Sequence, residues 1–174
     1  HEVLKEGFVD VYEGEGKRTG AYSSSMPNMH PFILLNYDGT LDSVFTVAHE
    51  SGHSMHSMYA AESQPTMLQD YTIFVAEIAS TFNEHALLDY FLKLPGVTKD
   101  EKIMVIQKAI DNIVGTFYRQ TLFAEYELKA HELIENDQPI THEVLSNIMI
   151  ELYKKYYDID ITAEKVKQYV WAYI

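Results

Sequence analysis

The sequence predicts a mainly α fold with a small antiparallel β ribbon or sheet near the N-terminus. Up to residue 40 the chain is rich in glycine, tyrosine, serine and β-branched residues, and apolar residues alternate with polar ones as strands require. After residue 40 the apolar residues recur with helical spacing, and capping, proline and glycine signals punctuate the pattern. We expect one domain over 1–174 that is β-rich over 1–40 and helical over 41–174.

Three extended segments are expected in the β-rich part. Alternation predicts a strand over Phe8–Tyr12 and an extended segment over Thr19–Ser23, joined by a glycine-containing turn over 13–17. These two segments are expected to pair as an antiparallel ribbon. After a loop over 24–31, the apolar run Pro31–Tyr37 predicts a third strand, and the proline at its start is compatible with a sheet edge.

Five helices are expected beyond residue 40, and most have a recognisable start or stop signal. The third begins with a capping box, in which the side chains of Thr98 and Glu101 satisfy each other's backbone N–H groups. The expected helices run from Thr40 or Asp42 to about Tyr59, from about Leu68 to Leu92, from Thr98 to about Ile134, from Thr141 to about Tyr156, and from Thr162 to the end.

The composition excludes several classes of partner. The 174 residues include 13 basic and 26 acidic side chains, so the formal net charge is −13. Nucleic acid and anionic membranes both bind basic surfaces, so neither is expected as a partner. No apolar run approaches the roughly 20 residues that a membrane-spanning helix needs. Cysteine is absent, so any metal site must use His, Asp or Glu.

Both ends of the sequence indicate a piece of a larger protein. The first residue is His1 rather than an initiator methionine, and the last five residues, 170–174, form an apolar run in an expected helix. Natural termini are more often polar and frayed. We therefore expect residues 1–174 to be a partial domain of a longer chain.

The central chemical motif is His49-Glu50-Ser51-Gly52-His53. In a helix, side chains at positions i and i+4 lie on one face, so both imidazoles can converge on one metal ion. The intervening glutamate is rotated too far to be a third ligand, but it can reach a water on the metal. The motif therefore predicts one zinc ion per chain, held by His49 and His53, with Glu50 as the catalytic acid and base.

The surroundings of the motif indicate a buried helix. Val44, Phe45 and Val47 precede it, and polar groups buried without partners are costly. A metal would provide such partners. Gly52 inside a helix costs about 1 kcal/mol relative to alanine. Either another element or the substrate approaches closely at this position, or the glycine is merely tolerated at a tight helix crossing.

A catalytic zinc also needs a third protein ligand, for which Glu77 is the candidate. It lies 24 residues after His53 among apolar residues, and ionised carboxylates are almost never buried unpaired. A helix that folds back after Pro65 would bring Glu77 to the two histidines. The alternative is a buried acid paired with lysine or arginine, although no basic residue occurs between Arg18 and Lys93.

Four further side chains are candidates for supporting a ligand or touching substrate. Glu84 and Asp70 lie seven residues on either side of Glu77, so either can accept the second ring N–H of a ligand histidine. A surface position is the alternative for both, and more so for Asp70. His56 follows the motif on nearly the same helix face, and His30 precedes the apolar strand. For each histidine a structural role is the alternative.

Five segments carry a family resemblance: Val9–Tyr12, Lys17–Ser23, His30–Tyr37, the metal motif extended through His56, and Phe74–Glu84. In order and in spacing they resemble oligoendopeptidase F, of the thimet-oligopeptidase-like zinc metallopeptidases. The resemblance covers essentially the whole chain. It is specific because several separate motifs agree at once.

The resemblance implies a largely helical catalytic domain with a small sheet beside a deep channel, which cleaves short oligopeptides. It implies that His49, His53 and Glu77 are the zinc ligands and that Glu50 is the catalytic acid and base. It also implies a cytoplasmic location. The partners that it implies are short peptide substrates and the remaining N- and C-terminal parts of the full-length enzyme.

In the expected mechanism, Glu50 takes a proton from the attacking water and passes it to the leaving amine. The strand over Phe32–Tyr37 would hold the extended substrate by β-addition. One alternative is a catalytically incomplete fragment that acts only as a metal-binding helical module. A serine hydrolase is poorly supported because no G-x-S-x-G occurs. A ferritin-like carboxylate site would need a second Glu-x-x-His pair besides Glu50 and His53.

Overall fold

The structure is a computed structural model that describes residues 3–5, 7–27 and 29–174. Its contacts divide the chain into two compact units, His1–Val105 and Ile106–Ile174, and each has its own apolar core. Helices account for 64% of the residues, which confirms the mainly α class. Among the described helices, none is both long enough and apolar enough to cross a bilayer.

The first unit carries a three-stranded mixed sheet with the strand order β1-β3-β2. β1 (Val9–Asp10) pairs in parallel with β3 (Phe32–Leu34), and β2 (Tyr22–Ser24) pairs antiparallel with β3. The predicted ribbon between the first two strands is therefore wrong, and so is the edge position of the third. The physical reason is burial, because Ile33 is only 2% exposed and pairing on both sides satisfies its backbone groups.

The loop predicted over 24–31 connects β2 to β3, and Asn28 within it lies outside the described residues. The predicted turn over 13–17 is confirmed by a hydrogen bond from the N–H of Lys17 to the carbonyl of Gly14. The core of this unit is small. It is formed by Val3, Ile33 and Leu35, with Val9, Ala21, Val47 and Met58 packed around them.

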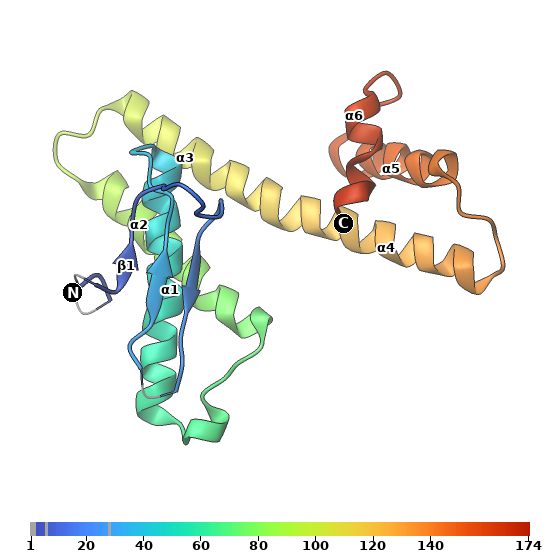
Figure 1. Cartoon of the computed structure of the whole chain (residues 1–174). Coiled ribbons are helices and arrows are strands. Elements are labelled where there is room, and N and C mark those ends of the chain that lie inside the picture. Colours follow the sequence, from blue (N-terminus) through green and yellow to red (C-terminus); the bar gives the residue numbers. More distant parts are fainter. Residues whose placement is uncertain (1–2, 6, 28) are drawn as a thin grey trace. The chain divides into compact units, whose positions relative to one another are not determined.

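Two helices of the first unit, α1 (Leu41–Ser63) and α2 (Ile73–Lys93), pack side by side (Figure 1). Thr40 caps α1 as predicted, by accepting a hydrogen bond from the N–H of Ser43. α1 is about one turn longer than predicted. α2 starts at Ile73, later than the predicted Leu68: a short 3-10 turn, η1 (Thr66–Leu68), ends at Leu68, and residues 69–72 between the turn and α2 are not helical.

Gly52 lies where α1 and α2 cross. A Cβ atom at this position would lie 2.7 Å from the carbonyl oxygen of Ala79 and 2.8 Å from the Cα of Ser80, closer than real Cβ atoms approach. Both are backbone atoms, so neither can turn aside as a flexible side chain would. The close neighbour is thus another helix. Asn83 strengthens the crossing, because its side-chain N–H donates to the carbonyl of Ala48 at 2.6 Å.

α3 (Lys99–Ile113) runs across the boundary between the two units and begins with the predicted capping box. The N–H of Thr98 donates to Oε2 of Glu101 at 2.8 Å, and the N–H of Glu101 donates to Oγ1 of Thr98 at 3.3 Å. A π-helical turn, η2 (Val114–Tyr118), leads on to α4 (Arg119–Glu135). The long third helix predicted from the sequence is therefore a helical run interrupted by this turn.

The second unit packs α4 against α5 (His142–Tyr157), which Thr141 caps as predicted. The predicted final helix is wrong in its extent. α6 spans only Lys165–Gln168, and a 3-10 turn, η3 (Val170–Tyr173), follows it. Local side-chain hydrogen bonds hold the backbone around Thr162, where the predicted helix would begin. Asp160 accepts the N–H of Thr162, and Gln168 donates to the carbonyls of Ile161 and Thr162.

The start of α1 offers a titration test. Hydrogen bonds from the hydroxyls of Ser43 and Thr40 lower the pKa of Asp38 from 3.8 to about 2. The pKa of Asp38 is lower in the folded than in the unfolded chain. Its hydrogen bonds therefore stabilise the fold above pH 3.8, and this contribution is lost as the pH falls toward 2. Ser43→Ala should raise the pKa of Asp38 toward its ordinary value in a carboxyl-carbon NMR titration. An unchanged midpoint would show that Ser43 does not hold this carboxylate.

The helix crossing offers a stability test. Gly52→Ala should lower the denaturant midpoint of the first unit, because α1 and α2 must move apart to admit a methyl group; such overpacking costs about 1–3 kcal/mol. Gly115→Ala, in the π-helical turn η2 of the second unit, is a control for the substitution itself, since a Cβ there meets nothing within 4 Å. It should leave the stability unchanged or raise it slightly. Denaturant unfolding is monitored by circular dichroism. A midpoint of Gly52→Ala equal to that of the parent would contradict the close crossing.

Candidate metal centre

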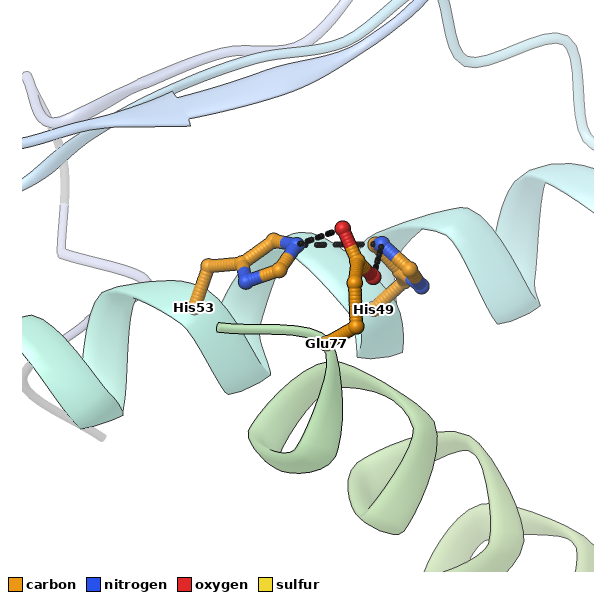
Figure 2. A group of neighbouring side chains, drawn as sticks. All are labelled: His49, His53 and Glu77. Atoms are coloured by element: carbon orange, nitrogen blue, oxygen red, sulfur yellow. Dashed lines mark hydrogen bonds and ion pairs between the residues drawn. The ribbon is translucent and has the colours of Figure 1, made fainter. Parts of the chain in front are cut away.

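Three side chains with metal-binding groups converge in the first unit (Figure 2). His49 and His53 project from one face of α1, one turn apart, and Glu77 projects toward them from near the start of α2. One ligand atom of each residue lies within 4.8 Å of those of the other two. The structure therefore brings together the three residues that the sequence predicts as a ligand set.

The atoms that face one another are those that zinc accepts. The Nε2 atoms of His49 and His53 are 3.1 Å apart. Oε2 of Glu77 lies 3.4 Å from Nε2 of His49, and Oε1 lies 3.8 Å from Nε2 of His53. Two imidazoles and one carboxylate are a common donor set for a catalytic zinc, with a further position left for water. The donor set therefore fits a zinc ion.

Glu77 differs from the expectation in its burial. Its side chain is 44% exposed, and its neighbours Phe74 and Ile78 are 78% and 57% exposed. The argument that a buried carboxylate must have a partner therefore does not apply to it. Two features hold Glu77 near the histidines instead. They are the helix crossing at Gly52 and a hydrogen bond of 2.9 Å from the hydroxyl of Ser80 to Oε2.

Glu84 contacts the first histidine from the side away from the cluster. Its Oε1 lies 2.6 Å from Nδ1 of His49, and this hydrogen bond raises the pKa of His49 although burial opposes it. When the N–H at Nδ1 is donated to Glu84, Nε2 keeps its lone pair toward the cluster. The carboxylate near the ring of His53 is that of Glu77, 3.8 Å from Nε2, and burial lowers the pKa of His53. Glu84 thus occupies the supporting position that its spacing predicts.

Glu50 is the most enclosed acid of the group, with 7% of its surface exposed. Burial raises its pKa, and the nearby Glu77 adds to the effect, while His49 and a hydrogen bond with the backbone of Ser23 oppose it. The hydroxyls of Ser23 and Ser54 lie 2.8 Å apart, which ties β2 to α1 beside Glu50. A carboxyl group in this environment is suited to accepting and returning a proton.

The remaining candidates lie outside the cluster. His56 stacks on Tyr71 with ring centroids 3.8 Å apart, and its buried Nδ1 has no hydrogen-bond partner among the described residues. His30 stacks on Phe8 at 3.8 Å, and its Nδ1 lies 2.6 Å from a backbone carbonyl. Asp70 is exposed and accepts the N–H of Tyr71. Asp70 also lines the pocket that adjoins His53, and the supporting or substrate-binding roles of these three residues stay predictions.

The sequence analysis missed two residues of the site, Ser80 and Ser23, and only the first had a signal that could have found it. Ser80 stands three residues after Glu77, and this helical spacing was the signal available for it. Ser23 carries no local signal, because its contact with Glu50 joins a strand to a helix. A pocket of about 450 Å³ adjoins the cluster at His53 and is also lined by Ser23 and Tyr71.

The whole chain, residues 1–174, matches peptidase family M3. Group B oligopeptidase PepB of Streptococcus agalactiae is 42% identical over 176 residues, which cover 100% of this chain and 29% of PepB. Oligopeptidase PepF of Bacillus subtilis is 40% identical over 178 residues, which cover 99% of this chain and 26% of PepF. The chain thus spans less than a third of the length of these curated relatives.

Two crystal structures are similar. A protein from Chlamydophila abortus assigned as a peptidase is 45% identical, with a TM-score of 0.76 over 97% of this chain and 28% of that one. A protein from Bacillus anthracis assigned as an oligoendopeptidase F is 20% identical, with a TM-score of 0.72 over 96% of this chain and 29% of that one, and it shows the shared fold alone. Because the family match extends over every residue, the chain belongs to peptidase family M3.

Proposed function

We propose that the chain is the zinc-binding core of a metalloendopeptidase that hydrolyses short oligopeptides. The observation that carries the proposal is the convergence of His49, His53 and Glu77 on one point, with Glu50 beside them. Membership of peptidase family M3 supports peptide hydrolysis. The names of the relatives, oligopeptidase and oligoendopeptidase F, support short peptides as the substrate class.

In this proposal His49, His53 and Glu77 hold one zinc ion. When bound, zinc lowers the pKa of water and polarises the carbonyl group of the peptide bond. Glu84 orients the ring of His49 through Nδ1 and so keeps Nε2 available. The sequence offers no lysine or arginine between Arg18 and Lys93, so the acids of this site have no nearby basic residue in sequence to neutralise them.

Glu50 is the proposed acid and base. As a carboxylate it takes a proton from the attacking water, and as a carboxylic acid it returns a proton to the leaving amine. Its burial supports both steps, because a raised pKa brings the two protonation states closer in free energy near neutral pH. The backbone hydrogen bond with Ser23 keeps the carboxyl group in a fixed place between these steps.

The strand proposed to bind substrate changes with the observed topology. β3 is paired on both sides over Phe32–Leu34, so this part of the predicted strand Phe32–Tyr37 cannot add a peptide. β2 lies at a sheet edge, and its Ser23 contacts Glu50. We therefore assign substrate binding to β2. An extended peptide added there would pass beside Glu50, with the adjoining pocket open to one of its side chains.

The chain is proposed to be one partial catalytic domain of a longer, cytoplasmic enzyme. It spans 26–29% of the relatives PepB and PepF, which supports N- and C-terminal parts as partners. Phe74, Ile78 and Phe82 on α2 are 57–78% exposed, and such an apolar face is typical of a surface that other protein covers. If this face is covered in the longer protein, the chain alone lacks part of the enzyme. The alternative for the chain alone is therefore a catalytically incomplete module that only binds metal.

Glu50→Gln tests the proposed chemistry. The variant should retain zinc but lose at least about 100-fold in the rate of cleavage of a quenched fluorescent peptide, because glutamine cannot take up the proton. Glu62→Gln, at an exposed position of the same helix, is the matched control and should cleave at the parent rate. Parent-like cleavage by Glu50→Gln would remove Glu50 from the mechanism.

A further inference from the structure

Ser80 connects the helix crossing to the proposed ligand Glu77. Its side chain is completely buried, although it stands only three residues from the half-exposed glutamate. The hydroxyl lies 3.1 Å from the main-chain carbonyl of Glu77 and 2.9 Å from the carboxylate oxygen Oε2. One oxygen of Glu77 is therefore held from within α2.

The position of Ser80 is itself fixed by α1. The Cα of Ser80 is one of the two backbone atoms that exclude a side chain at Gly52, which lies between the two histidines in sequence. Asn83 holds the next turn of α2 to the carbonyl of Ala48, immediately before the first histidine. The hydroxyl that contacts Glu77 thus belongs to the segment of α2 that packs most closely on the metal motif.

We propose that Ser80 is a positioning residue for the metal ligand Glu77, an inference that rests on the proposed function. An exposed glutamate loses side-chain freedom when it becomes a ligand. The hydrogen bond from Ser80 restricts the carboxylate before the ion arrives, and leaves Oε1 directed toward His53. Ser80 therefore raises the affinity for zinc without touching the ion.

A purely structural role predicts a different result, and the neighbouring Thr81 distinguishes the two. The hydroxyl of Thr81 also donates to the main-chain carbonyl of Glu77, at 2.5 Å, but its other contact is the carbonyl of Ile78. Thr81→Ala thus removes a helical hydroxyl bound to the same carbonyl, while it leaves the carboxylate contact in place. It is the matched control for Ser80→Ala.

The experiment measures the dissociation constant of zinc by competition with a chromophoric chelator, in the intact natural protein that carries this chain. Ser80→Ala should weaken zinc binding about 10–100-fold, the usual effect of removing a group that orients a ligand. Thr81→Ala should bind zinc as the parent does. In the Glu77→Ala background, Ser80→Ala should cause no further loss, because the group through which it acts is gone.

Three results would overturn the role of Ser80: parent-like zinc affinity of Ser80→Ala, an equal loss in Thr81→Ala, or the full loss in the Glu77→Ala background. If Ser80→Ala does not fold in its metal-free form, Ser80→Cys gives the same comparison, because the thiol is only a weak donor. A parent that binds no zinc would instead contradict the proposed function itself.

Discussion

The close crossing of α1 and α2 at Gly52 is the contact on which the candidate site depends. The two histidines lie on α1, and Glu77 lies on α2, so their distances follow from how near the two helix backbones come. A glycine is required at the crossing because backbone atoms of α2 occupy the space of a Cβ. The side-chain hydrogen bond from Asn83 to the carbonyl of Ala48 joins α2 to α1 next to the motif, and Ser80 holds the carboxylate of Glu77 from within α2.

Three acids of the site differ in environment, and the differences assign their proposed roles. Glu50 is buried and its pKa is raised, which suits proton transfer. Glu84 is bound to the ring of His49, which suits orientation of that ring. Glu77 is half-exposed, and Ser80 donates a hydrogen bond to its Oε2 while both of its carboxylate oxygens face the histidines, which suits a metal ligand. Carboxylates of one chemical type thus take separate functions from their surroundings.

Features that depend on a few neighbouring residues could be predicted from the sequence, whereas the pairing of strands that are distant in sequence could not. The caps of α1 and α5 and the capping box of α3 are short-range patterns, and all were predicted correctly. The sheet was predicted with the wrong pairing, because whether a strand pairs with its neighbour or with a later strand depends on burial. The prediction of the final helix failed for another reason, because local side-chain hydrogen bonds of Asp160 and Gln168 to the backbone of Thr162 compete with helical ones.

The candidate site shows the same division. The spacing of His49 and His53 and the position of Glu84 follow from helical geometry. In the structure the two histidines face each other, and Glu84 contacts the ring of His49. Glu77 was selected because it was expected to be buried, yet it is 44% exposed. Ser23 was missed because its contact with Glu50 joins a strand to a helix. Contacts between elements depend on packing, which a single sequence does not display.

The most direct test of the account is the zinc content per chain, measured by elemental analysis on the purified protein and on Glu77→Ala. Glu62→Ala, at an exposed position of α1, controls for the loss of one carboxylate. The account predicts close to one zinc per chain in the parent and in Glu62→Ala, and clearly less in Glu77→Ala. Equal zinc contents in the parent and Glu77→Ala would contradict a site built from both helices.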